Sequence, residues 1–180
     1  MLISIIVVII LALSFFGGLK EGAVKNSFSL LTLLIAIPLT GLYYGLVASF
    51  LSFLPETWAN FFGFYIVLTI LVVILSLVFM IPKRAIQKIW GNGFFYRLIG
   101  GVVGLVYAGV AITLFTIVIL TYPVFGFLAQ WFAGSSVLEW LVENLAFVQA
   151  LLPAEFEKTA GSFTVAVGFL GSYSRFQSLH

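Results

Sequence analysis

Long stretches without a charged side chain alternate with short polar or basic stretches along the chain. Four of the apolar stretches are long enough to cross a membrane, because a helix rises 1.5 Å per residue and the hydrocarbon core is about 30 Å thick. The second, third and fourth of them contain no charged residue. We therefore predict transmembrane helices at about residues 1–19, 27–54, 61–81 and 98–121.

The connections between these predicted helices differ in charge. The first and third are basic, whereas the second, between Pro55 and Asn60, contains Glu56 as its charged residue. Short loops that are rich in Lys and Arg remain on the cytoplasmic side of a membrane. Two basic loops on that side and four spans would place both termini outside the cytoplasm. The basic residues are Lys20 and Lys25 in the first connection and Lys83, Arg84, Lys88 and Arg97 in the third.

The third connection also has a helical pattern. Pro82 suits the first turn of a helix, and Ile86 and Ile89 fall on the side opposite the cations. Gly91 and Gly93 would end this helix. We predict a short basic helix on the inner leaflet, whose cations either fix the topology alone or also bind lipid headgroups.

Beyond Pro123 the chain stays apolar but gains polar residues. Ser136 and Glu139 have the spacing of a capping box, and Glu139 and Glu143 lie four residues apart on one helix face. We predict an amphipathic helix at about residues 136–152 that rests on the outer surface of the membrane. A fifth span is disfavoured because each glutamate near its centre would cost a few kcal/mol.

These elements define an all-α, polytopic membrane protein with four transmembrane helices and an interfacial amphipathic helix after the last span. The membrane domain covers residues 1–153. The C-terminal tail, residues 154–180, mixes polar and apolar residues without a clear period, and no element is assigned to it.

The fourth predicted span contains small residues at a spacing of four. Gly100, Gly104 and Ala108 would form a groove on one helix face, where the backbone of another helix can approach closely. That helix belongs either to the same chain or to a second copy. Arg97, at the start of this span, and Gly22, before the second span, would fix the ends of their helices.

Composition restricts the chemistry. Hydrophobic residues make up 63% of the 180 residues and charged residues 8%, whereas a soluble domain is about 45–50% apolar and about 25% charged. The net charge of +2 is too small to indicate nucleic-acid binding. The chain has no cysteine and no aspartate, and its one histidine is His180. We therefore expect no catalytic, cofactor-binding or metal-binding residue, and we interpret Glu139 and Glu143 as the polar stripe of an amphipathic helix.

Transport by an ion-coupled carrier is also disfavoured. Such carriers need an ionisable residue inside the membrane, and the three central spans have only hydroxyl groups such as those of Thr40, Thr69 and Thr116. A passive channel or a transporter subunit remains an alternative. The expected partners are the lipid bilayer and either a second copy of the chain or another membrane protein.

Three short motifs resemble those of one bacterial family. Residues 22–31 (GAVKNSFSLL) are similar to the small, basic and leucine-rich start of the second span in the colicin V production (CvpA) family. Residues 97–104 (RLIGGVVG) resemble its motif of an arginine followed by glycines, and residues 136–141 (SVLEWL) resemble its serine–leucine motif. The sequence departs from the family pattern at Asn26, where an acidic residue is common, and at Ser4.

This resemblance implies a bacterial inner-membrane protein with four spans and a link to toxin production, export or envelope function. It brings no catalytic residue and no cofactor. Our main hypothesis is a non-enzymatic membrane protein of this type, and the channel or transporter subunit is the alternative.

Overall fold

The structure is a computed structural model, and it describes residues 2–89, 93–122, 124 and 126–153. The predicted tail, with His180, lies outside the described residues, as do Gly91 and its two neighbours. The described part consists of helices joined by short turns and contains no strand. Its elements are α1 (Leu2–Glu21), α2 (Ala23–Phe50), α3 (Glu56–Val78), α4 (Met80–Ile89), α5 (Phe94–Thr121), α6 (Gly126–Ala133), α7 (Ser136–Asn144) and α8 (Ala146–Ala150).

Four of these helices, α1, α2, α3 and α5, are long and apolar enough to cross a membrane. They confirm the prediction of an all-α protein with four spans. The helices are longer than predicted at several ends: α2 begins at Ala23, α3 at Glu56 and α5 at Phe94. The apolar pattern marks the residues that lipid surrounds, whereas the backbone hydrogen bonds of a helix continue into the polar region beyond.

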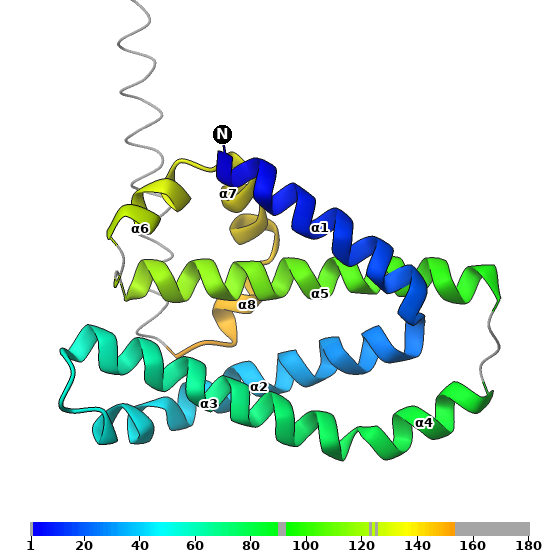
Figure 1. Cartoon of the computed structure of the whole chain (residues 1–180), viewed down its shortest axis with the longest axis horizontal. Coiled ribbons are helices and arrows are strands. Elements are labelled where there is room, and N and C mark those ends of the chain that lie inside the picture. Colours follow the sequence, from blue (N-terminus) through cyan, green and yellow to red (C-terminus); the bar gives the residue numbers. More distant parts are fainter. Residues whose placement is uncertain (1, 90–92, 123, 125, 154–180) are drawn as a thin grey trace, which may run out of the picture.

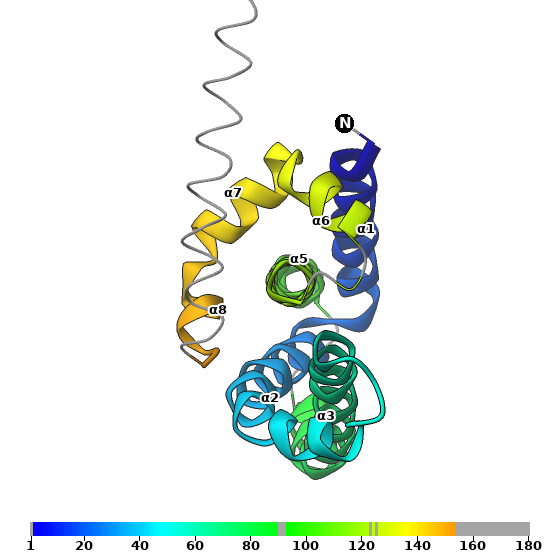
Figure 2. The same ribbon diagram turned by 90° about the vertical axis from the view of Figure 1, so that its left-hand side faces the viewer.

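Helix α5 lies in the centre of the fold (Figures 1 and 2). It packs against α1 on one side and against α2 on the other, while α3 packs mainly against α2. Helices α1 and α3 run toward one end of the molecule, and α2 and α5 run back from it (Figure 1). The four spans therefore form an open, antiparallel arrangement rather than a closed bundle.

The connection between the first two spans is much shorter than predicted. Gly22 alone separates α1 from α2, so the expected loop between residues 19 and 27 does not exist. Lys20 lies in the last turn of α1 and Lys25 in the first turn of α2. The charges interrupt the hydrophobic pattern there, but they do not interrupt the helices.

The third connection contains the predicted short helix, α4, which begins at Met80, two residues before Pro82. It continues almost directly from α3, because the Phe79 N–H donates to the carbonyl of Leu75 and the Lys83 N–H donates to the carbonyl of Phe79. Lys88 belongs to α4, but its side chain lies outside the described part.

The region after α5 differs from the single helix predicted at residues 136–152. Three short helices, α6, α7 and α8, form an arc that begins beside α1 and passes around α5 (Figure 2). Helix α7 begins at Ser136, but its N-cap is Ser135, whose Oγ accepts a hydrogen bond from the Leu138 N–H at 3.5 Å. Leu145 separates α7 from α8.

The arc is part of the core of the protein. Leu138 and Leu141 of α7 are buried against Val7 of α1. Val148 is completely buried in α8 and joins the main core, which α2, α3 and α5 share. Pro153, at the end of the arc, lies against Gly41 of α2. These contacts explain the break at Leu145, because a continuous helix could not follow the curved surface of α5.

The C-terminal half of the arc packs at the depth of the spans. Leu141 and Leu145 lie over Gly109, where an added Cβ atom would be 3.7 and 3.3 Å from their methyl groups. Gly109 is about 18 Å along α5 from Arg97, at 1.5 Å per residue. That distance is roughly half of the helix, so this part of the arc is not confined to the ends of the spans.

We expect Leu138→Ala to destabilise the protein by about 2–4 kcal/mol, because it removes a completely buried side chain between α7 and α1. Trp140→Ala is the matched control on the exposed face of the same helix. Thermal unfolding in detergent would compare the two variants. A smaller loss for Leu138→Ala than for Trp140→Ala would show that α7 does not pack on the spans.

Candidate functional site at the glycine junction

The closest approach between spans lies where α1 and the start of α2 meet α5. We call this site the glycine junction, and it consists of Gly18, Gly22, Gly100 and Gly104. All four glycines are buried. A Cβ atom on Gly18 would overlap the carbonyl oxygen of Gly100, and one on Gly100 would lie 2.5 Å from the carbonyl carbon of Gly22. Backbone therefore packs directly on backbone, as in other membrane helix pairs with small residues.

The predicted packing residues of α5 lie within this fold rather than on its surface. Gly104 faces α1, since an added Cβ atom would be 2.8 Å from the carbonyl oxygen of Ser14. Ala108 is buried one turn further along α5. The glycine face of α5 is thus covered by α1 of the same chain.

Gly22 is required at its position for two reasons. Its φ angle is +82°, in the left-handed region that side chains other than glycine rarely adopt. An added Cβ atom would also overlap the ring of Tyr96. The Tyr96 hydroxyl accepts a hydrogen bond from the Val24 N–H at 3.3 Å, which satisfies one of the free amides at the start of α2.

Asn26 joins the three helices of the junction through its side-chain amide. The Asn26 Nδ2 lies 3.2 Å from the carbonyl oxygens of Gly18 and Gly22 and 3.1 Å from that of Gly100, and it donates to all three. An amide has only two N–H bonds, so the three acceptors share two hydrogens. The side chain is 6% exposed. Its loss would remove the side-chain hydrogen bonds that join α2 to α1 and α5, at a cost of about 0.5–1.5 kcal/mol for each bond.

Sequence reasoning missed Gly18 and the two residues that bond to the junction, Asn26 and Tyr96. Gly18 and Gly22 have the same spacing of four as Gly100 and Gly104, which was a usable signal. Asn26 was noticed only as a departure from a family pattern. No signal pointed to Tyr96, because its contact with the start of α2 depends on how α5 is placed.

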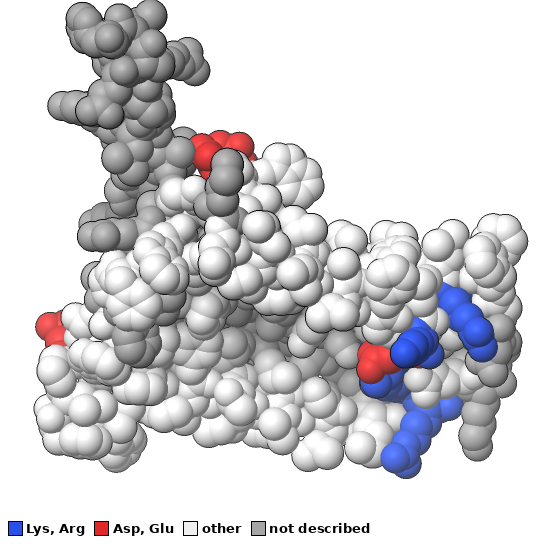
Figure 3. All heavy atoms as spheres, turned by 45° about the horizontal axis from the view of Figure 1, so that its top comes forward, with Lys and Arg blue, Asp and Glu red and all other residues white. Residues whose placement is uncertain are grey.

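Cations gather at the end of the molecule where α1 meets α2 and where α5 begins (Figure 3). We call this region the basic end. Glu21 is its one described carboxylate, and it pairs with Lys25 across the turn at Gly22. Burial lowers the pKa of Lys83, the nearby Lys25 ammonium lowers it further, and Glu21 partly opposes both effects. The described cations of this end are Lys20, Lys25, Lys83, Arg84 and Arg97.

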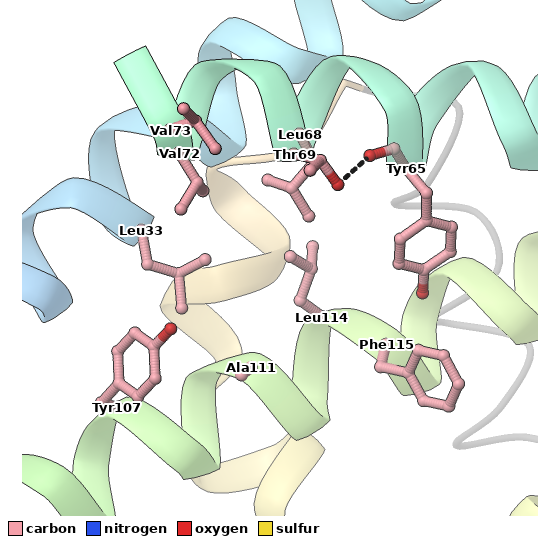
Figure 4. A pocket seen from close by; sticks show the side chains of 10 residues that line it. All are labelled: Leu33, Tyr65, Leu68, Thr69, Val72, Val73, Tyr107, Ala111, Leu114 and Phe115. Atoms are coloured by element: carbon pink, nitrogen blue, oxygen red, sulfur yellow. Dashed lines mark hydrogen bonds between the residues drawn. The ribbon is translucent and has the colours of Figure 1, made fainter. Parts of the chain in front are cut away.

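A groove of about 320 Å³ lies between α3 and α5, with Leu33 of α2 also lining it (Figure 4). Its walls are mostly aliphatic and aromatic. The Thr69 hydroxyl donates to the carbonyl of Tyr65 in its own helix, and the Tyr65 hydroxyl is buried without a hydrogen-bond partner among the described residues. Such a surface suits acyl chains or apolar side chains rather than a column of water.

The fold and the junction define a class: a polytopic α-helical membrane protein whose four spans are organised around α5. The chain matches the family described as Colicin V production protein over residues 3–146. It therefore belongs to that family, which confirms the resemblance in its three motifs. No curated protein and no solved structure matches it.

We expect Gly100→Ala to destabilise the protein strongly, because the new Cβ atom would meet backbone atoms of Gly22 that cannot move independently. Gly104→Leu should have a similar effect against α1. Thermal unfolding and size-exclusion chromatography in detergent would measure both.

Gly17→Ala is the matched control for this comparison, because an added Cβ atom at Gly17 meets nothing within 4 Å. It should leave the melting temperature unchanged or raise it slightly, since alanine favours helix more than glycine does. Equal melting temperatures for Gly100→Ala and Gly17→Ala would contradict the close backbone contact.

Proposed function

We propose that this protein is a non-enzymatic component of the bacterial inner membrane that supports the production or export of a toxin, or envelope homeostasis. The observation that carries this proposal is the family match over residues 3–146, which includes all four spans. We further propose that the protein acts as a homo-oligomer or with another membrane protein.

The chemistry of the described residues supports a non-enzymatic role. The family is not known as a family of enzymes. In the described part of the chain, no group of three His, Cys, Asp or Glu side chains could hold a metal ion. Glu139 and Glu143 lie on α7 away from its buried face, which Leu138, Leu141 and Val142 form, as expected for a polar stripe.

The alternative of a passive channel or a transporter subunit has less support. Several hydroxyl groups in the spans are bonded to their own helices: Thr40 donates to the carbonyl of Ala36, and Thr116 donates to that of Ile112. Such bonds leave little polarity to line a path. The groove beside Tyr65 is largely apolar, and the described helices of one chain are arranged openly and enclose no pore.

We also propose an orientation for the chain. The basic end carries the described Lys and Arg side chains, whereas Glu56 is the first residue of α3, which begins at the opposite end of the molecule (Figure 1). The excess of cations on one side supports a cytoplasmic basic end. The N-terminus and the region after α5 would then lie outside the cytoplasm.

Single cysteines can test this orientation, because the native chain has no cysteine. A membrane-impermeant thiol reagent, applied to intact cells with a permeable outer membrane, should label Glu56→Cys. It should label Ser27→Cys, an exposed position at the basic end, only after the cells are opened. The reverse pattern would mean that the chain is inserted the other way.

Deletion of the gene in its own host tests the proposed role. We expect reduced secretion of the host's peptide toxin, if it makes one, or greater sensitivity to membrane-active detergents. The wild-type gene and Gly17→Ala should restore the phenotype, whereas Gly104→Leu should not. A deletion strain that matches its parent in both assays would contradict the proposal, and ion flux through the purified protein in liposomes would favour the channel.

A further inference from the structure

We propose that Lys25 and Lys83 form a binding site for the phosphate of an anionic phospholipid at the basic end. This site would do more than mark the cytoplasmic side of the membrane. It rests on the contact between the two helices that carry these lysines, on the presence of a single described carboxylate near them, and on exposed apolar side chains at the same end of the molecule.

Helix packing brings the two lysines together from distant parts of the sequence. Lys25 lies in the first turn of α2 and Lys83 in α4, and these two helices are in contact. The rings of Phe28 and Phe79, 5.7 Å apart, fix the contact just beside the lysines. The Lys25 ammonium is close enough to lower the pKa of Lys83, so the two cations repel one another.

The protein does not neutralise this pair. Glu21 is the one carboxylate at the basic end in the described part, and it forms an ion pair with Lys25. Lys83 forms no ion pair among the described residues, although burial has removed part of its water. Lys25 also lies at the start of a helix, where the helix dipole favours an anion rather than a cation. A phosphate between the two lysines would offset both the repulsion between them and the unfavourable interaction of Lys25 with the helix dipole.

The surroundings indicate that the phosphate belongs to a lipid. Ile81 in α4 is 79% exposed, and Phe94 and Phe95 at the start of α5 are 75% and 77% exposed. Exposed apolar side chains at the same end of the molecule as the two cations match an amphiphile whose headgroup binds the lysines while its acyl chains follow the spans. Free phosphate would leave this apolar surface uncovered by any part of the ligand.

Lipid titrations of the purified full-length protein in neutral detergent test the proposal. Phosphatidylglycerol should raise the melting temperature of the wild-type protein, whereas phosphatidylcholine and inorganic phosphate should not. Native mass spectrometry should show bound phosphatidylglycerol. Lys83→Gln should weaken the apparent affinity roughly fivefold, as expected for one lysine near an anionic headgroup.

Lys20→Gln provides the charge-matched control. It removes one cation from the same end of the molecule, but Lys20 lies in the last turn of α1, outside the contact between α2 and α4. We expect this variant and Lys83→Arg to bind phosphatidylglycerol like the wild type, and Lys83→Arg also shows whether the fold tolerates a change at this position. Equal losses in Lys83→Gln and Lys20→Gln would overturn the site in favour of general surface charge. A full response to inorganic phosphate alone would overturn the lipid as its occupant.

Discussion

The close approach of the α1 and α5 backbones is the constraint on which the rest of the structure depends. Lipid offers no hydrophobic reason for two apolar helices to associate, so their association relies on short-range packing and on hydrogen bonds. Gly18 and Gly100 permit the packing, and Asn26 adds hydrogen bonds to both of them. Because Gly22 joins α1 directly to α2, the same contact also sets the position of the second span.

Helix α5 is the common support for everything else that is described. Helix α1 packs on it at the glycines, α2 packs on its opposite side, and the arc of α6, α7 and α8 covers much of what remains. Helix α3 is different, since it is attached mainly through α2 and leaves a groove beside α5. Of the four spans, α5 is therefore well covered by protein, and the other three face lipid over much of their surface.

The sequence determined the number of spans because uninterrupted apolar runs such as that of α5 have no other explanation at this length. The spacing of Gly100 and Gly104 indicated a packing face, and both residues pack against α1 in the structure. The partner could not be predicted, because many helices could meet such a face. Asn26 and Tyr96 form hydrogen bonds with backbone groups more than 70 residues away in the sequence. No local sequence pattern predicts such contacts. The break at Leu145 was missed for the same reason, since no proline or glycine marks it and tertiary packing causes it.

The order of the helices along the chain has a consequence for how the protein is made. Helix α1 is synthesised before α5, the helix that covers its glycine face, and two further spans lie between them. Throughout that interval Gly18 faces lipid or the insertion machinery, and the Asn26 amide lacks its acceptor on α5. Helix α1 thus reaches its final packing only after α5 has been inserted. Until then, the single residue Gly22 between α1 and α2 keeps α1 next to the second span.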